Sequence, residues 1–250
     1  MSYFNQKIIK KNKGLYKDSQ MIISHRYKFI FIKTNKTAGT SIEIALSKFC
    51  GEDDIITPNE AEDEAIRKSL GHRGPQHYLA PLKDYRPIDI YRYIARKRKK
   101  DRFYHHISAK EIKQLISEDI WNNYYKFCFE RNPWYRVISF YYWRLKKNPR
   151  QTISEFIDSG LPEVLHEYGY GRYTINDKIV VDRVCLFENL SRELEIVSKA
   201  LNFPEIPVLP KAKSAIRKDK RHYREILNSE DKKKIEKLFH REIQLFNYNY

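Results

Sequence analysis

The sequence has few cysteines, glycines and methionines for its length. Its 250 residues include eight glycines, two methionines and three cysteines, Cys50, Cys128 and Cys185. An odd number of widely spaced cysteines does not provide a disulfide framework, so we expect buried free thiols, a reducing compartment and a cytoplasmic location. No run approaches the ~20 apolar residues that a membrane-spanning helix needs, and the N-terminus does not resemble a secretory signal.

Positive charge and aromatic residues are abundant. Lysine and arginine number 48 against 32 acidic residues, a formal net charge of +16, and aromatic residues make up 14% of the chain. The 41% hydrophobic content can build a core, which excludes wholesale disorder. The excess of positive charge predicts a polyanionic partner: nucleic acid, an anionic membrane, an acidic glycan or a phosphorylated cofactor.

Strand-like and helix-like segments alternate along the chain after a polar, basic arm at residues 1–20. Short β-rich runs at 27–32, 126–133 and 179–188 predict strands. Apolar periodicity and capping residues predict helices at 41–49, 108–118, 134–147, 152–158, 189–203 and 229–246, the last with Ser229 as its N-cap. The Gly- and Tyr-rich stretch 160–177 predicts a loop. This alternation predicts an α/β fold with a central parallel sheet covered on both faces.

Three stretches have strongly biased charge. Residues 52–64 carry seven acidic residues and no basic one, which is typical of a solvated loop and helix start. Residues 92–102 and 211–224 each carry seven basic residues and one acidic residue. Such runs usually solvate a surface, although the basic ones could also bind an anion.

The segment KTNKTAGT lies between the first predicted strand and its helix, an arrangement that binds phosphate. A helix start offers N–H groups without partners and the positive end of the helix dipole. Gly39 permits close approach of the backbone, hydroxyls of Thr37, Thr40 and Ser41 can donate to phosphate oxygens, and Lys36 supplies charge. The nucleotide-triphosphate signature G-x-x-x-x-G-K-[ST] is not present. An ordinary, well-capped helix start is the alternative interpretation.

Two segments together resemble the sulfotransferases that use 3′-phosphoadenosine 5′-phosphosulfate (PAPS), in the carbohydrate and bacterial-type subgroup. FIKTNKTAGTSIE is similar to their 5′-phosphosulfate loop, and FERNPWYRVISFYY to their 3′-phosphate-binding strand and helix. The resemblance implies a P-loop-like sulfotransferase domain over residues 21–250. It departs from the usual pattern at Asn35, where proline is common, and at Lys33, where histidine is common.

The resemblance implies a role for each matching residue. Lys36 would stabilise charge on the leaving phosphate, and the residues around it would form the cradle, namely Thr37, Ala38, Gly39, Thr40 and Ser41. Arg131 and Ser139 would hold the 3′-phosphate. The product would be 3′-phosphoadenosine 5′-phosphate (PAP), and sulfuryl transfer of this kind requires no metal. Because an isolated arginine is costly to bury, the position of Arg131 after an apolar strand also favours an anionic ligand on physical grounds.

A histidine would act as the catalytic base. The segment around His105 and His106 resembles Y-H-x-H-V-S of uronyl 2-O-sulfotransferases, and the match assigns the base to His106 with His105 as its neighbour. Glu43 is the alternative, because other sulfotransferases place a glutamate in the helix after the phosphate loop. His72 and His77 are further options, and a purely structural histidine remains open.

The acceptor is predicted to be a carbohydrate or another small hydroxylated molecule, which the basic residues 92–102 could bind if it is anionic. Arg217, Lys218 and Tyr223 match a basic loop that covers the nucleotide in the family. Tyr168, Tyr170 and Tyr173 could stack on a sugar, although packing within the loop is favoured. The alternatives are an ATP-dependent kinase with Asp182 or Glu188 as its metal-binding acid, a nucleic-acid-binding module, and an inactive relative. Nucleic acid is the disfavoured partner, because the basic stretches match no motif that binds it.

Overall fold

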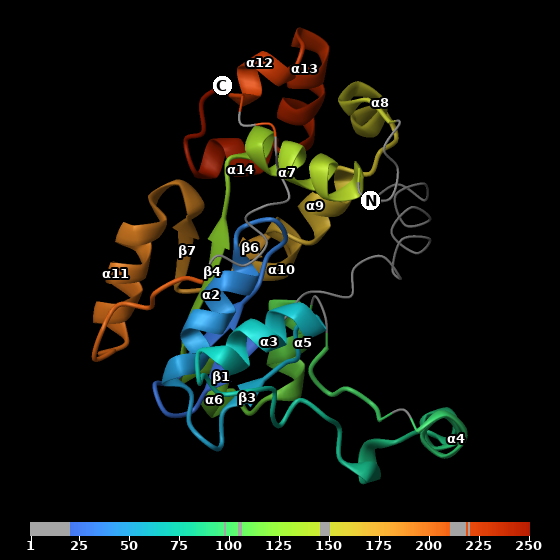
Figure 1. The fold of residues 1–250 in the computed structure, drawn as a ribbon, viewed down its shortest axis with the longest axis vertical. Helices are drawn as coiled ribbons and strands as arrows, with labels where there is room; N and C mark the ends of the chain where they lie inside the picture. Colours follow the sequence, from blue (N-terminus) through green and yellow to red (C-terminus); the bar gives the residue numbers. More distant parts are fainter. Residues whose placement is uncertain (1–20, 98, 105–106, 146–150, 211–218, 220) are drawn as a thin grey trace.

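A computed structural model describes residues 21–97, 99–104, 107–145, 151–210, 219 and 221–250 of the protein. Its centre is a five-stranded sheet with the strand order β3-β1-β2-β4-β7 (Figure 1). The strands are β1 (Met21–Ser24), β2 (Phe29–Ile32), β3 (Ile55–Ile56), β4 (Tyr125–Glu130) and β7 (Arg183–Leu186). A separate two-stranded ribbon joins β5 (Thr174–Ile175) to β6 (Lys178–Ile179).

The central sheet is mixed, and not wholly parallel as the sequence predicted. Strands β2, β4 and β7 run parallel, with Phe31 beside Phe127 and Phe129 beside Cys185. Strand β1, which the sequence analysis missed, pairs antiparallel with both β2 and β3. The predicted α/β class is correct, and the parallel prediction holds for the three strands that were predicted.

Helices cover the sheet on both faces. The helices of the first two-thirds of the chain are α2 (Gly39–Leu46), α3 (Ala61–Ser69), α4 (Pro87–Arg96), α5 (Ala109–Leu115), α6 (Glu118–Asn123), α7 (Pro133–Leu145), α8 (Ile153–Asp158) and α9 (Glu163–Glu167). They are followed by α10 (Tyr170–Tyr173), α11 (Leu190–Ala200), α12 (Tyr223–Ile226), α13 (Ser229–Leu238) and α14 (His240–Leu245), with short 3₁₀ turns η2 (Ser47–Phe49), η3 (Leu82–Asp84) and η4 (Phe187–Asn189). None of the described helices combines the length and apolar character needed to cross a membrane.

Alternation along β2 divides the core into two layers. Phe29 and Phe31 pack on the face covered by α2 and α11, whereas Ile30 and Ile32 pack on the face covered by α5 and α6. Both sets are fully or almost fully buried, as expected for a central strand enclosed by helices. A third cluster joins α7 to α8, α9, α12 and α13 around Trp134. The three cysteines are buried and free, as predicted.

Two further sequence predictions need correction. The stretch 160–177, predicted as a loop, contains α9, α10 and β5. The predicted terminal helix is interrupted at Phe239, which divides it into α13 and α14, and its N-cap is Asn228 instead of Ser229. The N-terminal arm proposed for residues 1–20 lies outside the described residues.

Candidate functional site

The loops that follow the three parallel strands meet at one edge of the sheet. Residues 33–38 follow β2, Arg131 and Asn132 follow β4, and η4 follows β7. An Arg131 guanidinium nitrogen, Nη1, donates to the Lys36 carbonyl at 3.2 Å, and the Asn132 N–H donates to Glu188 Oε1 at 2.8 Å. Ligands of open α/β sheets bind at this carboxyl edge. The two segments singled out in the sequence are therefore in direct contact.

The loop before α2 has a backbone suited to an anion. Lys36 and Ala38 have left-handed φ angles of 64° and 60°, and Ala38 is the N-cap of α2. Among the described residues, no side chain caps this helix start. The first N–H groups of a helix have no acceptor within it, so an anion can satisfy them. Successive N–H groups in such turns also form concave anion sites.

Neighbouring elements hold this loop in place. The Asn35 N–H donates to the Tyr168 carbonyl, and Arg136 Nε donates to the Asn35 carbonyl, each at 2.9 Å. Thr37, which is 1% exposed, donates its hydroxyl to the Thr34 carbonyl at 3.1 Å. The Thr37 side chain therefore shapes the loop, which leaves its backbone as the part that can face a ligand.

Lys33 points into the protein and not into solvent. Its Nζ donates to Thr40 Oγ1 at 2.9 Å and lies 3.5 Å from Glu43 Oε2, and its side chain is 5% exposed. Its methylenes cover Gly39 so closely that a Cβ at Gly39 would lie 2.5 Å from Lys33 Cγ. Gly39 is thus required by the packing of Lys33.

Glu43, the alternative base, is fully buried between two cations. Arg67 Nη2 donates to its Oε1 at 2.8 Å, while Lys33 approaches its other oxygen. Burial raises the pKa of the Glu43 carboxyl, although Lys33 and Arg67 oppose the shift. An acceptor molecule could reach this carboxyl only by displacing those partners, so the geometry disfavours Glu43 as the base.

Helix α7 carries the second half of the site. The Arg131 guanidinium lies 4.3 Å from the centre of the Phe187 ring. Ser139, half-buried, is one helical turn from both Tyr135 and Trp143, so the three side chains share a face. Lys36 Nζ lies 5.6 Å from the centre of the Trp143 ring. Lys36 therefore projects toward the same helix face that bears Ser139.

A buried network beneath Arg131 was not anticipated from the sequence. Glu130, with no exposed surface, accepts hydrogen bonds from the Arg131 N–H and the Tyr173 hydroxyl, each at 3.0 Å, and from Arg136 Nη1. Burial raises the pKa of Glu130. The only available signal was an acidic residue at the end of an apolar strand. The network fixes the start of α7 relative to the loop at residues 33–38.

His105, His106, Arg217 and Lys218 lie outside the described residues. Residues near the two histidines connect to the loop at residues 33–38 through intermediates. Ser108 and Tyr104 both bond to Glu111, whose Oε2 lies 3.7 Å from Arg172 Nη1. The Arg172 guanidinium stacks 4.3 Å from the centre of the Tyr168 ring, and the Tyr168 carbonyl binds the loop.

The remaining candidates have structural contacts. His72 and His77 bond to the backbone carbonyls of Ile44 and Glu52. Tyr168, Tyr170 and Tyr173 are buried, which agrees with packing over sugar stacking. Tyr223, assigned to the loop that covers the nucleotide, is buried as well, and its ring stacks on Trp134. Glu188, an acid considered for a kinase metal site, accepts hydrogen bonds from the Asn132 N–H and the Tyr248 hydroxyl.

This fold and site define an α/β protein in which a strand–loop–helix junction meets Arg131 in the loop of a second strand–loop–helix unit. The chain belongs to the sulfotransferase family, whose profile matches residues 19–173. It is 34% identical over 97 residues to an uncharacterized protein of Archaeoglobus fulgidus, covering 38% of this chain and 81% of that protein. No solved structure gives a significant match. Membership of the family indicates an enzyme that transfers a sulfuryl group.

Proposed function

We propose that the protein transfers the sulfuryl group of PAPS to a hydroxyl of a carbohydrate or another small acceptor, with a histidine as base. The observation that supports this most is the 3.2 Å hydrogen bond from Arg131 to the Lys36 carbonyl. It joins the two segments that would hold the two ends of a donor bearing a 5′-phosphosulfate and a 3′-phosphate.

The residues present fit such a donor. The start of α2 and the left-handed turns at Lys36 and Ala38 suit a multiply charged anion. Gly39 begins α2, and Thr40 and Ser41 follow in its first turn. Arg131 offers a planar set of donors and Ser139 a hydroxyl for a second phosphate. Two candidate anion-binding groups, joined by the hydrogen bond from the Arg131 side chain to the Lys36 carbonyl, match a donor with two charged ends.

PAPS supplies an activated sulfuryl group attached to a phosphate. Transfer of such a group leaves little covalent work for the protein, so orientation and charge stabilisation dominate the rate. Lys36 stabilises the negative charge that develops on the leaving phosphate. Arg136 and Tyr168 hold the loop around Lys36 by their hydrogen bonds to Asn35. The lysine is therefore presented by a preorganised backbone.

We assign the base to His106, with His105 as its neighbour. A base must contact the acceptor hydroxyl and take its proton as the oxygen attacks. The support is indirect: Tyr104 and Ser108 flank the histidines, and their common partner Glu111 pairs with Arg172 beside the phosphate loop. Arg217 and Lys218 are proposed to close over the nucleotide. The described neighbour Asp219 accepts a hydrogen bond from the Tyr142 hydroxyl of α7 at 2.8 Å, which supports this proposal.

Calorimetric titration with PAP and with 5′-AMP tests the proposal. Lys36→Met and Arg131→Met keep the apolar stems and remove the charges. Because hydrogen bonds to charged groups contribute about 1.5–3 kcal/mol, each variant should bind PAP about 10- to 100-fold more weakly. Only Arg131→Met should also abolish the preference for PAP over 5′-AMP, since that preference comes from the 3′-phosphate.

Two controls accompany this titration. Lys237→Met removes an exposed lysine of α13, far along the chain from the site, and should leave PAP affinity unchanged. His106→Ala should also retain it, because the base acts on the acceptor. Wild-type protein that binds ATP–Mg but not PAP would favour the kinase alternative, and PAP binding unaffected by both site variants would contradict the proposal.

A further inference from the structure

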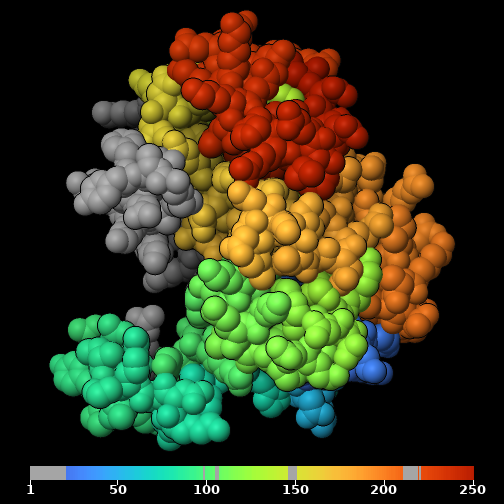
Figure 2. Space-filling model, turned by 180° about the vertical axis from the view of Figure 1, so that it is seen from behind, coloured from blue at the N-terminus to red at the C-terminus, as the bar shows by residue number. Residues whose placement is uncertain are grey.

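Residues 78–97 and 99–103 form an arm that carries α4 away from the body of the protein, as Figures 1 and 2 show from opposite sides. We call these residues the α4 arm. Its outgoing and returning segments run antiparallel. The Ala80 N–H donates to the Lys100 carbonyl and the Arg102 N–H donates to the Tyr78 carbonyl, each at 2.9 Å. These hydrogen bonds fix the end of the arm that joins the body of the protein.

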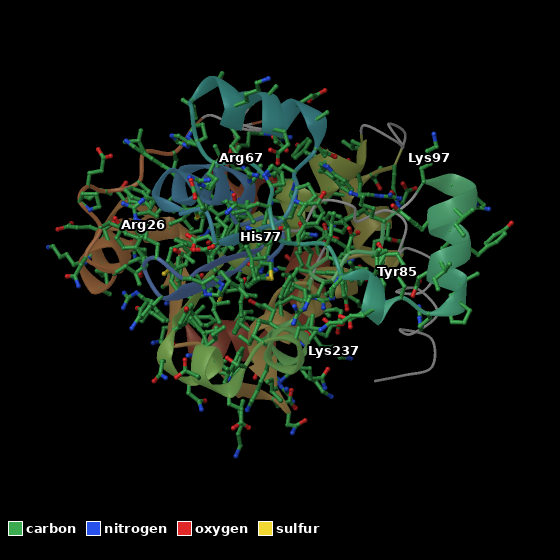
Figure 3. The ribbon with its side chains drawn as sticks, turned by 90° about the horizontal axis from the view of Figure 1, so that it is seen from below. Arg26, Arg67, His77, Tyr85, Lys97 and Lys237 are labelled. Atoms are coloured by element: carbon green, nitrogen blue, oxygen red, sulfur yellow. The ribbon has the colours of Figure 1, made fainter. Side chains whose placement is uncertain are left out.

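The ends of α4 are also defined. Pro87 occupies its first turn, and Lys97 ends it in a left-handed conformation with φ of 50°. Asp89, only 6% exposed, accepts from the Arg86 N–H at 3.2 Å and lies 3.2 Å from Lys100 Nζ. Asp89 thus turns one side of α4 toward the returning chain. In Figure 3, Tyr85 and Lys97 mark this helix at the margin of the molecule.

The side of α4 opposite Asp89 is apolar and exposed. At 100° per residue, Tyr91 and Ile94 lie on that side, and they are 61% and 73% exposed. Leu82 on the neighbouring turn is 67% exposed, and Ile88 and Ile90 are each nearly half exposed. Large apolar side chains gathered on one projecting element mark a contact surface.

The α4 arm is also rich in basic residues. Residues 82–102 contain nine lysines and arginines, and only three acidic residues, Asp84, Asp89 and Asp101. A second copy of the arm would bring the same positive charge to the contact. The first 20 residues carry five lysines and one aspartate, and would likewise be repelled. The charge therefore favours an anionic occupant that also accepts apolar side chains.

We propose that the α4 arm docks the protein on the surface of an anionic lipid bilayer. A helix with exposed apolar side chains and nearby lysines and arginines lies in the plane of the membrane interface. Its apolar side sits at the acyl boundary and its basic side chains lie at the headgroups. Nucleic acid would pair with the lysines and arginines but leave Tyr91 and Ile94 in water. The bilayer surface accommodates both features. This proposal does not depend on the identity of the sulfuryl donor.

Vesicle co-sedimentation of the full chain tests this proposal, with phosphatidylglycerol–phosphatidylcholine vesicles compared with pure phosphatidylcholine. Wild-type protein should bind the anionic vesicles at least about tenfold more tightly, since each lysine or arginine near such a surface raises the affinity roughly fivefold. Ile94→Glu should weaken binding about tenfold or more, because it places a charge at the apolar boundary. Val208→Glu makes the same charge change at a residue that is 80% exposed elsewhere, and should change binding less than about twofold.

Other outcomes overturn the proposal. Equal binding by wild type and Ile94→Glu would mean that charge alone adsorbs the protein. Absence of vesicle binding, with an oligomer in light scattering that Ile94→Glu dissociates, would assign the face to a second copy. Absence of vesicle binding with α4-dependent binding to an oligonucleotide would assign it to nucleic acid. Unchanged thermal unfolding of Ile94→Glu, expected for so exposed a residue, confirms that the variant is folded.

Discussion

Lys33 connects the end of β2 to two helices through charges that are out of water. Its Nζ contacts Thr40 and Glu43 of α2, and Glu43 in turn binds Arg67 of α3, which also donates to Glu64 at 2.9 Å. Removing one member of a buried pair leaves an uncompensated charge, which is strongly unfavourable. The loop at residues 33–38 is thereby fixed to α3 as well as to α2.

Replacing Gly39 with alanine tests the packing of Lys33. The new Cβ would lie 2.5 Å from Lys33 Cγ, and the lysine is enclosed by its partners. Overpacking of this kind costs about 1–3 kcal/mol, which exceeds the gain of roughly 1 kcal/mol from a better helix former. We therefore expect Gly39→Ala to lower the free energy of unfolding in urea.

Gly51→Ala is the matched control. A Cβ at Gly51 would meet Arg26 atoms at 3.6 Å, which is ordinary contact. This variant should change the free energy of unfolding by less than about 0.5 kcal/mol. Equal losses in both glycine variants would show that Lys33 packing is not the cause.

The sequence predicted which residues belong to the candidate site better than it predicted the directions of their side chains. The resemblance assigned both Lys36 and Arg131 to the donor site, and the structure brings them together because parallel strands end at one edge. The direction of Lys33 could not be predicted, because it is set by Glu43 and by Arg67, which lies 24 residues beyond Glu43. The Glu130 network depends likewise on Tyr173, which is 43 residues away.

Elements with a strong local signal were the ones predicted from the sequence. Ser108 caps α5, and Glu111 Oε2 accepts a hydrogen bond from the Ser108 N–H at 2.8 Å, in agreement with the helix start predicted from capping residues. The loop prediction for residues 160–177 was wrong because the glycines and tyrosines there have little helical propensity, which hid the helices from the sequence. Tertiary contacts hold it: a Cβ on Gly169 would clash with the Arg136 guanidinium. Strand β1 has four residues and is defined by its neighbours.

The start of α13 distinguishes two adjacent capping residues. Asn228 Oδ1 accepts the N–H groups of Glu230 and Asp231 at 2.9 and 2.8 Å, whereas Ser229 is the first helical residue. Loss of an N-cap costs about 1 kcal/mol. Asn228→Ala should lower the free energy of unfolding by about that amount, measured by urea denaturation, and Ser229→Ala should have little effect. The reverse order would restore the original prediction.

The stability of the whole molecule depends on buried carboxyls whose pKa values are raised. Burial is the largest cause of the raised pKa at both Glu43 and Glu130, and the positive charges of the adjacent arginines oppose the shift. A carboxyl with a raised pKa in the folded state favours folding below its unfolded pKa of about 4.3. That contribution is lost as the pH rises through the folded pKa, by at most about 1.4 kcal/mol per pH unit for each group.

Glu43→Gln isolates this effect, because glutamine does not titrate. The free energy of unfolding of the wild type minus that of Glu43→Gln should fall as the pH rises from about 4.5 to 8, measured by urea denaturation at each pH. A difference that grows with pH would mean that attraction to Lys33 and Arg67 outweighs the cost of burial. Groups elsewhere titrate in both proteins, so their effects cancel in the difference.

The mixed sheet has a consequence for the order in which the protein assembles. Strands β1 and β2 are joined by four residues and can pair as soon as both exist, whereas Ile30 pairs with Lys126 far along the chain. Closing that long loop costs entropy before the contact can compensate it, so pairing of this kind is slow. A chain emerging from the ribosome thus carries Lys36 through much of synthesis without Arg131. The site comes into existence only when the central parallel pairing closes.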